Sequence, residues 1–414
     1  MLKIKPEAVF HPVPDHVPAE LVYPFEQIFV DGFEVDPWAV FRQVQQEAPP
    51  IFYSPISARG TGLWFVTRSD DVRTVFQDYS RFTTAVGYSQ GADMARRMLP
   101  LELDPPEHNK YRSLLTPLFA PKQIDRLEAS IRATCDALLE EIYARGTCEF
   151  MHDFSRTLPG TVFMHLMGLP MERAEEFFTW EETFFHGHSA EERKATGKAI
   201  EAALEELVAD RRKAPRDDLM SMLVTTTFDD GSPIPHNDVM DMCWLLFIAG
   251  LDTVHAGLGH SFRYLAEHPE LKQQLVDDPS LIPAAVEELL RWHTWVNPMR
   301  TVAQDCELNG VQMKKGDKIG TLAVIADRDP EVYENPDEIV LNRERTIHWA
   351  FGGGAHRCVG SHLARREIGI AIEAWINRIP GFRIAEGTGD NLRYAPLGMF
   401  SLPALQLAWD PASA

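Results

Sequence analysis

Apolar residues recur every three or four positions through much of the chain, which is the spacing of one helix face. This pattern predicts helices over 124–143 and 190–213, within a mostly helical region from about 104 to 210. The segment Asp104-Pro105-Pro106-Glu107 has the composition of a helix start, with a capping acid and prolines in the first turn. The middle of the chain is therefore expected to be helical.

The N-terminal part is less regular. The first sixty residues are rich in proline and aromatic residues and predict short helices and turns. Residues 63–67 are apolar and predict a strand, and Ser69 then offers a cap for a helix through Phe76. Residues 83–103 show no clear period, so we interpret them as a loop long enough to be functional.

The longest predicted helix runs from Asn237 to His268. Between Met242 and Ala249 apolar residues occupy every face, which is typical of a helix buried in a core. At about 1.5 Å per residue this helix would be roughly 45 Å long, enough to cross a domain. Pro269 is expected to begin the next helix.

The pattern changes after residue 300. Asn309-Gly310 and Lys315-Gly316 are turn signals between short β-prone runs. A glycine-rich loop over 351–360 leads into a final helix that starts at Ser361 and ends near Ile379.

These elements predict a mainly α protein with a minor β part, in one domain over 1–414. The α-rich part is expected at about 69–300, and the β parts near 60–68 and 305–325.

Composition narrows the function. The formal net charge is −21, and such an acidic chain repels phosphate backbones, so nucleic acid is not expected as a partner. No stretch approaches eighteen uncharged apolar residues and no signal peptide is apparent, so we expect a soluble, cytoplasmic protein without a membrane anchor. We also expect the protein to be a monomer. The five cysteines are scattered and form no CxxC pair, which argues against a disulfide framework and a structural zinc site.

Cys358 is the strongest candidate for chemistry. The glycines before it allow the backbone to approach a flat ligand closely. It also lies just before a predicted helix, whose N–H groups and dipole would stabilise a thiolate. A lone cysteine in a loop is more often a small buried side chain, and that alternative stands on spacing alone.

The surrounding loop resembles the haem-binding signature of the cytochrome P-450 superfamily, with Phe351, Gly354, His356, Cys358 and Gly360 at its fixed places. The resemblance covers nearly the whole chain and is nearest to the bacterial camphor hydroxylase and its relatives. It implies the P-450 fold, with a long central helix crossing over haem b. It also implies that Cys358 is the iron ligand of a monooxygenase.

Glu288 and Arg291 lie at i, i+3 on a predicted helix face, a spacing that also arises by chance on solvated helices. The resemblance places them at the family's Glu-x-x-Arg pair. It implies a structural ion pair completed by Arg343 or Arg345, without a catalytic role.

Gly250, Asp252 and Thr253 are unusual inside an apolar helix, because all three are poor helix formers. One interpretation is a helix bend held by a hydrogen bond from the threonine to the preceding turn. The resemblance implies an acid–alcohol pair on the oxygen side of the haem. Asp252 would admit protons, Thr253 would hydrogen-bond to the oxygen being activated, and Gly250 would make room for it.

The resemblance also implies haem-propionate contacts from His108, Arg112, Arg300 and His356, since cationic and donor side chains suit two carboxylates. It implies an acidic [2Fe-2S] ferredoxin, reduced by a flavin reductase, as electron donor. Arg112, Arg365 and Arg366 would offer it a local basic face; ordinary solvated charge is the alternative for each.

One departure concerns the substrate. The stretch from Asp93 to Leu99 lacks the tyrosine that hydrogen-bonds camphor in the camphor enzyme. Arg96 and Arg97 in this stretch are expected to point to solvent rather than to a substrate carboxylate. By alignment the pocket is expected to be lined by Tyr88, Leu245, Ile248, Ala249, Val296 and Met399.

This mostly apolar wall predicts a small, neutral cyclic terpenoid, such as a camphor-, cineole- or ionone-like compound, hydroxylated with O2. A peroxygenase and a non-catalytic haem sensor or carrier are the alternatives. The intact Asp252-Thr253 pair argues against the peroxygenase, and turnover with ferredoxin would distinguish an enzyme from a sensor.

Overall fold

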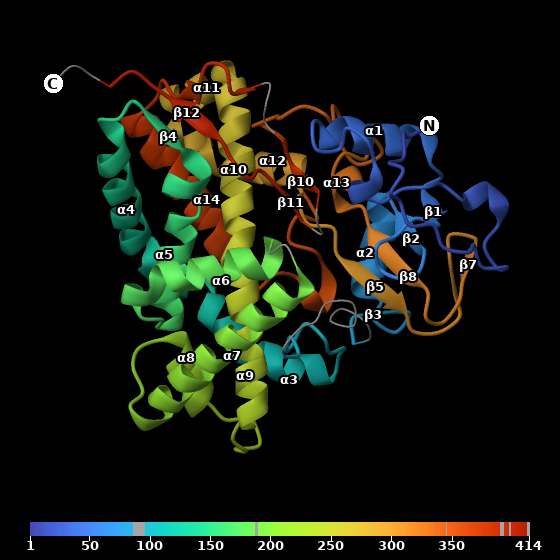
Figure 1. Ribbon diagram of the computed structural model, residues 1–414, viewed down its shortest axis with the longest axis horizontal. Helices are drawn as coiled ribbons and strands as arrows, with labels where there is room; N and C mark the ends of the chain where they lie inside the picture. Colours follow the sequence, from blue (N-terminus) through green and yellow to red (C-terminus); the bar gives the residue numbers. More distant parts are fainter. Residues whose placement is uncertain (86–95, 187–188, 345, 390–392, 397–398, 412–414) are drawn as a thin grey trace. The chain divides into compact units, whose positions relative to one another are not determined.

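The computed structural model describes the whole chain except residues 86–95, 187–188, 345, 390–392, 397–398 and 412–414. The helices of the described residues (Figure 1) are α1 (Pro37–Glu47), α2 (Ser69–Gln77), α3 (Glu107–Leu115), α4 (Pro121–Tyr143), α5 (Thr157–Met167), α6 (Ala174–His186), α7 (Ala190–Lys213), α8 (Leu219–Thr225), α9 (His236–Gly250), α10 (Asp252–Glu267), α11 (Pro269–Asp277), α12 (Ile282–His293), α13 (Ala323–Ala326) and α14 (Ser361–Arg378). The strands are β1 (Ile51–Ser54), β2 (Leu63–Val66), β3 (Phe82–Thr83), β4 (Thr147–Glu149), β5 (Met299–Val302), β6 (Cys306–Leu308), β7 (Val311–Met313), β8 (Lys318–Thr321), β9 (Arg383–Ile384), β10 (Ala395–Pro396), β11 (Phe400–Ser401) and β12 (Gln406–Ala408).

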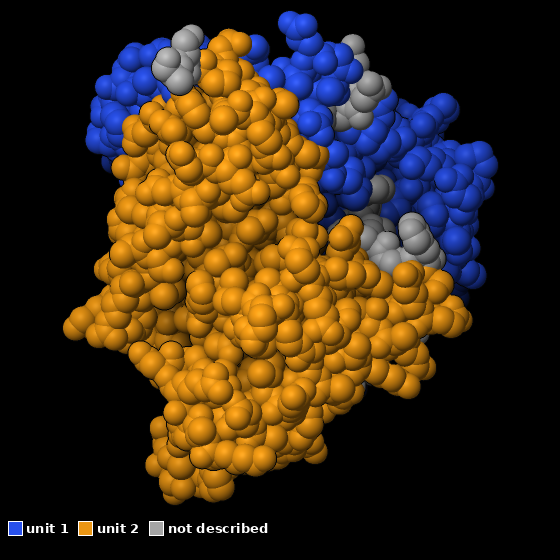
Figure 2. Space-filling view, turned by 60° about the vertical axis from the view of Figure 1, so that its left-hand side comes forward, with its two compact units in different colours: residues 1–88, 259–358, 380–408 blue, residues 89–258, 359–379, 409–414 orange. Residues whose placement is uncertain are grey.

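The chain forms two compact units, coloured separately in Figure 2. Unit 1 contains residues 1–88, 259–358 and 380–408, and unit 2 contains residues 89–258, 359–379 and 409–414. Each unit therefore combines three separate stretches of sequence. The prediction of one domain over the whole chain stays a prediction.

Unit 1 contains a five-stranded sheet in the order β1-β2-β8-β5-β3. Neighbouring strands are antiparallel except β2 and β8, which run parallel with Trp64 opposite Ile319. Trp64 and Val66 of β2 are fully buried and pack in a core cluster with Val75 and Phe76 of α2. The apolar run at 63–67 thus forms the predicted strand, and the helix predicted after it packs against the sheet.

The predicted turn at Asn309-Gly310 joins β6 to β7. Both residues have positive φ angles, 47° for Asn309 and 83° for Gly310, and these are the two residue types that adopt such angles most easily. This part of the β structure is confirmed. Strands β1, β3–β5 and β9–β12 lie outside the two predicted β parts, because strands of two to four residues leave little period in a sequence.

Two buried histidines stack in unit 1. The rings of His260 and His293 lie 5.0 Å apart at an interplanar angle of 23°, and Trp38 packs edge-on against both. His260 Nε2 lies 3.0 Å from the carbonyl oxygen of Phe400. No residue in the described part of the chain hydrogen-bonds either ring nitrogen of His293. Burial lowers the pKa of His260 to about 4 and that of His293 well below its usual value.

Both histidines are therefore neutral in the folded protein, and we expect acid to unfold it. Because their folded pKa values lie below the unfolded value, the stabilisation is complete above about pH 6.5 and falls as the pH drops toward 4. The His293→Phe variant should reduce the slope of unfolding free energy against pH by at most about 1.4 kcal/mol per pH unit. Urea unfolding between pH 4.5 and 7 measures this slope. The exposed His236→Gln variant is the control, and equal slopes in all three proteins would contradict the expectation.

In unit 2, helices α4 and α14 pack side by side. The buried residues of α4 are Ile124, Ile131, Cys135, Leu139 and Ile142, which recur at the helical spacing that predicted this helix. The helix begins three residues earlier than predicted, at Pro121, a residue that suits the first helical turn. Helix α7 has the predicted bounds.

The predicted long central helix is present with an interruption. It is divided into α9 and α10 at Leu251, whose backbone angles (φ −97°, ψ −57°) stay in the right-handed helical region. By length and composition alone, the stretch His236–Glu267 is apolar enough to cross a membrane, but 72% of its most apolar window is buried inside the protein. This burial agrees with the prediction of a core helix.

Two predicted helix caps differ from the structure. α2 begins at Ser69, so its cap position is Arg68, and α3 begins at Glu107 with Pro106 at its cap. Neither helix has a side-chain capping bond; instead, the backbone N–H of His108 donates to the carbonyl of Asp104. The prolines at 105 and 106 cannot donate, which shifts the first helical turn toward the C-terminus.

Candidate functional site

The glycine-rich loop around Cys358 is held by α2. Gly352 and Gly354 have φ angles of 62° and 65°, which L side chains rarely adopt. A Cβ on Gly354 would also overlap the carbonyl oxygen of Phe76, at the end of α2. The loop therefore needs glycine both for its conformation and for this close approach.

Within the loop, the backbone N–H of Cys358 donates to the carbonyl of Phe351 at 2.9 Å. The ring of Phe351 lies 5.8 Å from that of His348. The first and the eighth residues of the loop are thus tied together, and α14 begins three residues after Cys358.

Cys358 differs from the other cysteines in its exposure. Cys135, Cys148 and Cys243 are buried, and burial raises the pKa of each thiol to about 12. Cys306 is partly buried, whereas Cys358 is exposed. A thiol must lose its proton to ligate iron, so the exposed Cys358 fits a haem ligand better than the three fully buried thiols.

Two of the predicted propionate residues lie beside this loop in unit 1. The ring of His356 lies within 3.0 Å of the hydroxyl of Thr84. Arg300, on β5, is buried, and its guanidinium lies 5.3 Å from the ring centroid of Phe76, the residue that also contacts Gly354. The structure thus brings Arg300 and the cysteine loop together around Phe76.

The other two propionate candidates, His108 and Arg112, lie one turn apart on α3 in unit 2. His108 is buried and Nδ1 lies 3.2 Å from Asn109 Oδ1. Burial lowers the pKa of His108, which favours the neutral ring over the cation. Arg112 is therefore the better candidate of the two for a charged contact with a propionate.

The polar residues of the central helix lie at its break. Asp252 is buried at the start of α10. The hydroxyl of Thr253 donates to the carbonyl of Ala249 at 3.3 Å, across the break at Leu251. The helix bend with a threonine hydrogen bond is therefore present. The catalytic role of Thr253 stays a prediction.

Gly250 has a packing role that the sequence did not reveal. A Cβ at this position would overlap the ring of Phe163 on α5. The missing side chain thus lets α9 approach α5. The expectation that Gly250 lies beside the cofactor stays a prediction.

The substrate-pocket candidates separate into groups. On α9, Ala249 is exposed and Leu245 partly exposed, one turn apart, whereas Ile248 is buried. In unit 1, Val296 and Met399 form an antiparallel β-bridge, so residues about a hundred positions apart lie side by side. Tyr88 lies outside the described residues.

The expectation that Arg96 points to solvent is wrong. Its guanidinium pairs with Asp241 Oδ1 of α9 at 2.9 Å and with Glu201 Oε1 of α7 at 2.8 Å. It also donates to the carbonyl of Asn237 at 3.2 Å. Arg97 is exposed, as expected.

The predicted basic face for ferredoxin is weakened at one of its three residues. Arg366 on α14 pairs with Asp125 at 2.6 Å and with Glu128, both on α4. Arg365 donates to the carbonyl of Ser361. Because two carboxylates compensate its charge, Arg366 contributes little positive potential to a partner.

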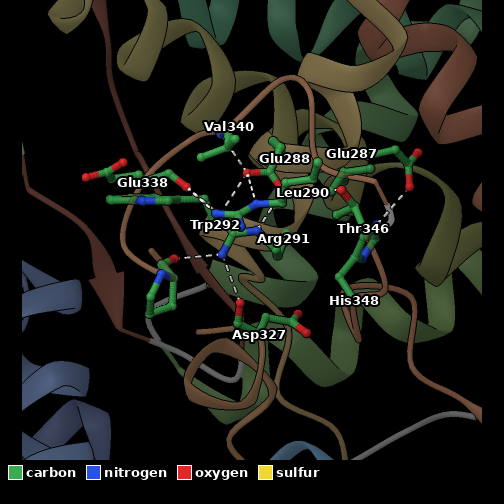
Figure 3. A network of polar contacts seen from close by, with 12 residues as sticks. Glu287, Glu288, Leu290, Arg291, Trp292, Asp327, Glu338, Val340, Thr346 and His348 are labelled. Carbon is green, nitrogen blue, oxygen red and sulfur yellow. Dashed lines mark hydrogen bonds and ion pairs between the residues drawn. The ribbon is translucent and has the colours of Figure 1, made fainter. Parts of the chain in front are cut away.

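The predicted Glu288–Arg291 ion pair is confirmed, with Arg343 as the third member (Figure 3). Arg291 binds both carboxylate oxygens of Glu288, at 2.8 and 2.9 Å, and Arg343 Nε binds the second at 3.0 Å. Arg291 also donates to the carbonyls of Asp327, Pro336 and Glu338. Burial would raise the pKa of Glu288, but the two arginines outweigh it and lower this pKa. Arg345 lies outside the described residues.

Asp327 is a residue that the sequence analysis missed. It is fully buried and accepts hydrogen bonds from the backbone N–H of Trp349 at 2.8 Å and the hydroxyl of Thr294 at 2.6 Å. It therefore ties the end of α12 to the segment just before the cysteine loop. No signal pointed to it, because the surrounding polar segment has no period.

A mainly helical fold with a glycine-rich cysteine loop before its last long helix is typical of enzymes that bind haem through a thiolate. The family model for cytochrome P450 matches residues 176–403. The probable cytochrome P450 127A1 of Sinorhizobium fredii is 38% identical over 385 residues, which are 91% of this chain and 92% of that protein. The chain belongs to the cytochrome P450 family.

Two further relatives show the range of the family. The mycinamicin IV hydroxylase/epoxidase of Micromonospora griseorubida is 31% identical over 335 residues, covering 78% of this chain and 84% of that protein. The crystal structure of cytochrome P450 CYP101C1 matches with a TM-score of 0.87 and 30% identity, over 96% of this chain and all of that one. The protein is accordingly a monooxygenase with the P450 fold and haem b as its cofactor, and it acts on a hydrophobic substrate with O2 and a redox partner.

Proposed function

We propose that this monooxygenase hydroxylates a small, neutral cyclic terpenoid of the camphor, cineole or ionone type. One observation carries the proposal: α9 has an accessible apolar stripe, formed by Leu245 and Ala249, on a helix whose other central side chains are buried. An apolar wall binds through buried area, at about 25 cal/mol per Å², and returns little to a charged ligand. The apolar pair Val296–Met399 would contribute a second wall.

The ion pairs of Arg96 support a neutral substrate. A guanidinium that already binds Asp241 and Glu201 has its charge compensated, so it would attract a substrate carboxylate weakly. The exposed Arg97 is the remaining cation of this stretch.

In this proposal Cys358 holds the iron, and Arg112, Arg300, His108 and His356 hold the propionates. The bound haem supplies the chemistry that activates O2. Asp252 passes protons toward the reacting oxygen. The hydroxyl of Thr253 hydrogen-bonds to that oxygen and holds the final proton next to it. Electrons come from a [2Fe-2S] ferredoxin with its flavin reductase. We also propose that the protein is related to the camphor hydroxylase, that it is cytoplasmic and that it is a monomer.

Spin-state titrations test the substrate. We expect cineole or ionone to be favoured ligands, and camphor to bind less tightly than it does to the camphor enzyme, because here its ketone lacks a tyrosine hydrogen bond worth on the order of 1 kcal/mol. A fatty acid should bind less tightly than any of the three. Arg97→Ala should leave terpenoid binding unchanged. Tightest binding by a fatty acid, lost in Arg97→Ala, would overturn the proposal, and so would tightest binding by a macrolide.

Thr253→Ala should still consume NADH with ferredoxin and reductase but release much of the reducing power as hydrogen peroxide. Without the hydroxyl the proton reaches the reacting oxygen less well, so product per NADH should fall by roughly tenfold or more. Thr253→Ser keeps the hydroxyl and serves as the control. An unchanged yield in Thr253→Ala would leave this residue with its helix-bending hydrogen bond alone.

A further inference from the structure

Helix α6 carries a buried carboxyl group that no predicted role explains. Glu181 is only 6% exposed, and its Oε1 has no hydrogen-bond partner among the described residues. Leaving such a group unsatisfied is unfavourable, because burial has removed its hydration and no hydrogen bond replaces it. A buried polar atom of this kind in a native protein calls for a functional explanation or a bound water.

The charged groups that act on Glu181 come from three neighbouring segments of unit 2. They are Asp252 at the start of α10, Glu182 on α6 itself, and Arg156 directly before α5. Burial, and then the charge of Asp252, raise the pKa of Glu181 to about 9, while Arg156 opposes them. Two buried carboxyl groups close together do not both ionise, so at neutral pH Glu181 holds its proton.

Arg156 connects this acid to the surface. Its side chain is mostly buried, and its Nε has no hydrogen-bond partner in the described part of the chain. The other end of the guanidinium pairs with Glu175 at 3.5 Å and with Glu182 at 3.8 Å, and both of these carboxylates are exposed. Arg156 thus pairs with exposed carboxylates and also interacts electrostatically with the buried Glu181.

We propose that Glu181 relays protons from the surface to Asp252 during turnover. The proposal rests on the proton-donating role of Asp252 in the proposed function. The O–H bond of Glu181 breaks and its proton passes to the Asp252 carboxylate. The Glu181 carboxylate is then protonated again by solvent, which supplies the protons that the reaction consumes. Monooxygenation consumes two protons with two electrons from the redox partner, so the relay acts twice for each oxygen atom inserted.

Arg156 does not titrate in this scheme. Its fixed positive charge stabilises the transient Glu181 carboxylate, and this lowers the barrier to each transfer. Glu181 acts on the reaction only through Asp252 and does not contact the substrate. It is therefore a positioning residue.

The test compares Glu181→Gln with Glu176→Gln, which removes an exposed carboxyl from the same helix. Glu181→Gln should lower the turnover rate by about tenfold and increase its solvent isotope effect in D2O. Turnover of the unmodified enzyme should decline as the pH rises toward 9, because Glu181 then loses its proton, whereas the profile of Glu181→Gln should be flat there. Glu181→Asp should restore part of the rate.

A second measurement needs no turnover. In difference infrared spectra of the resting enzyme at neutral pH, Glu181→Gln should remove one C=O stretch of a protonated carboxylic acid from the spectrum of the unmodified enzyme, whereas Glu176→Gln should remove none. Rate, isotope effect and pH profile equal to those of the unmodified enzyme in Glu181→Gln would overturn the relay. If Asp252→Asn slows turnover while Glu181→Gln does not, the relay alone is wrong. If neither variant differs from the unmodified enzyme, the role of Asp252 fails as well.

Discussion

The Cys358→His variant should lose the strongly red-shifted Soret band of the reduced carbon monoxide complex, together with essentially all hydroxylation. That band reports a thiolate opposite the gas, and an imidazole does not produce it. Among the cysteines, only Cys358 combines an exposed thiol with a loop shaped by left-handed glycines.

Cys306→Ser is the matched control, because it removes the other cysteine that is not fully buried. We expect this variant to keep both the band and the activity. A red-shifted band in Cys358→His would mean that another residue ligates the iron.

Glu288→Gln should lower the free energy of unfolding by about 3–5 kcal/mol, the usual effect of breaking a buried ion pair. The side chain of Arg291 is fully buried, and that of Arg343 nearly so. Removing the carboxylate therefore leaves two buried guanidinium groups without a compensating charge. Urea unfolding of the haem-loaded protein measures the change.

The neighbouring Glu287→Gln is the control. Glu287 is partly exposed and its carboxylate lies 3.1 Å from His348 Nε2, so this change should cost about 1 kcal/mol or less. Equal losses in the two variants would show that the ion pairs of Glu288 in Figure 3 add no more stability than the partly exposed Glu287–His348 pair.

The sequence predicted elements best where one period continued for many residues. Helix α7 has the predicted bounds because its 24 residues repeat one pattern between a serine cap and a basic end. The break at Leu251 was predicted only as one interpretation, a helix bend, since apolar residues continue on both sides of it and only Gly250 and the polar pair interrupt them.

The candidate site shows a similar division. Local motifs predicted the glycine-rich loop and the Glu288–Arg291 pair, whose members lie within one turn of a helix or one short loop. The partners of Arg96 lie 105 and 145 residues away, and no local pattern reports such a distance. Ile248 is buried although it lies three residues after the partly exposed Leu245, and helical spacing alone does not separate these two positions.

Each of the two units is built from three separate stretches of the sequence, and this arrangement limits how genes of this family can be recombined. A hybrid gene with one crossover near its middle would draw both units from both parents, because each unit uses stretches from the two halves of the sequence. Exchange of one intact unit requires junctions at 88/89, 258/259, 358/359, 379/380 and 408/409. The third junction falls directly after Cys358. A library that exchanges one intact unit therefore takes Cys358 and the helix that follows it from different parents.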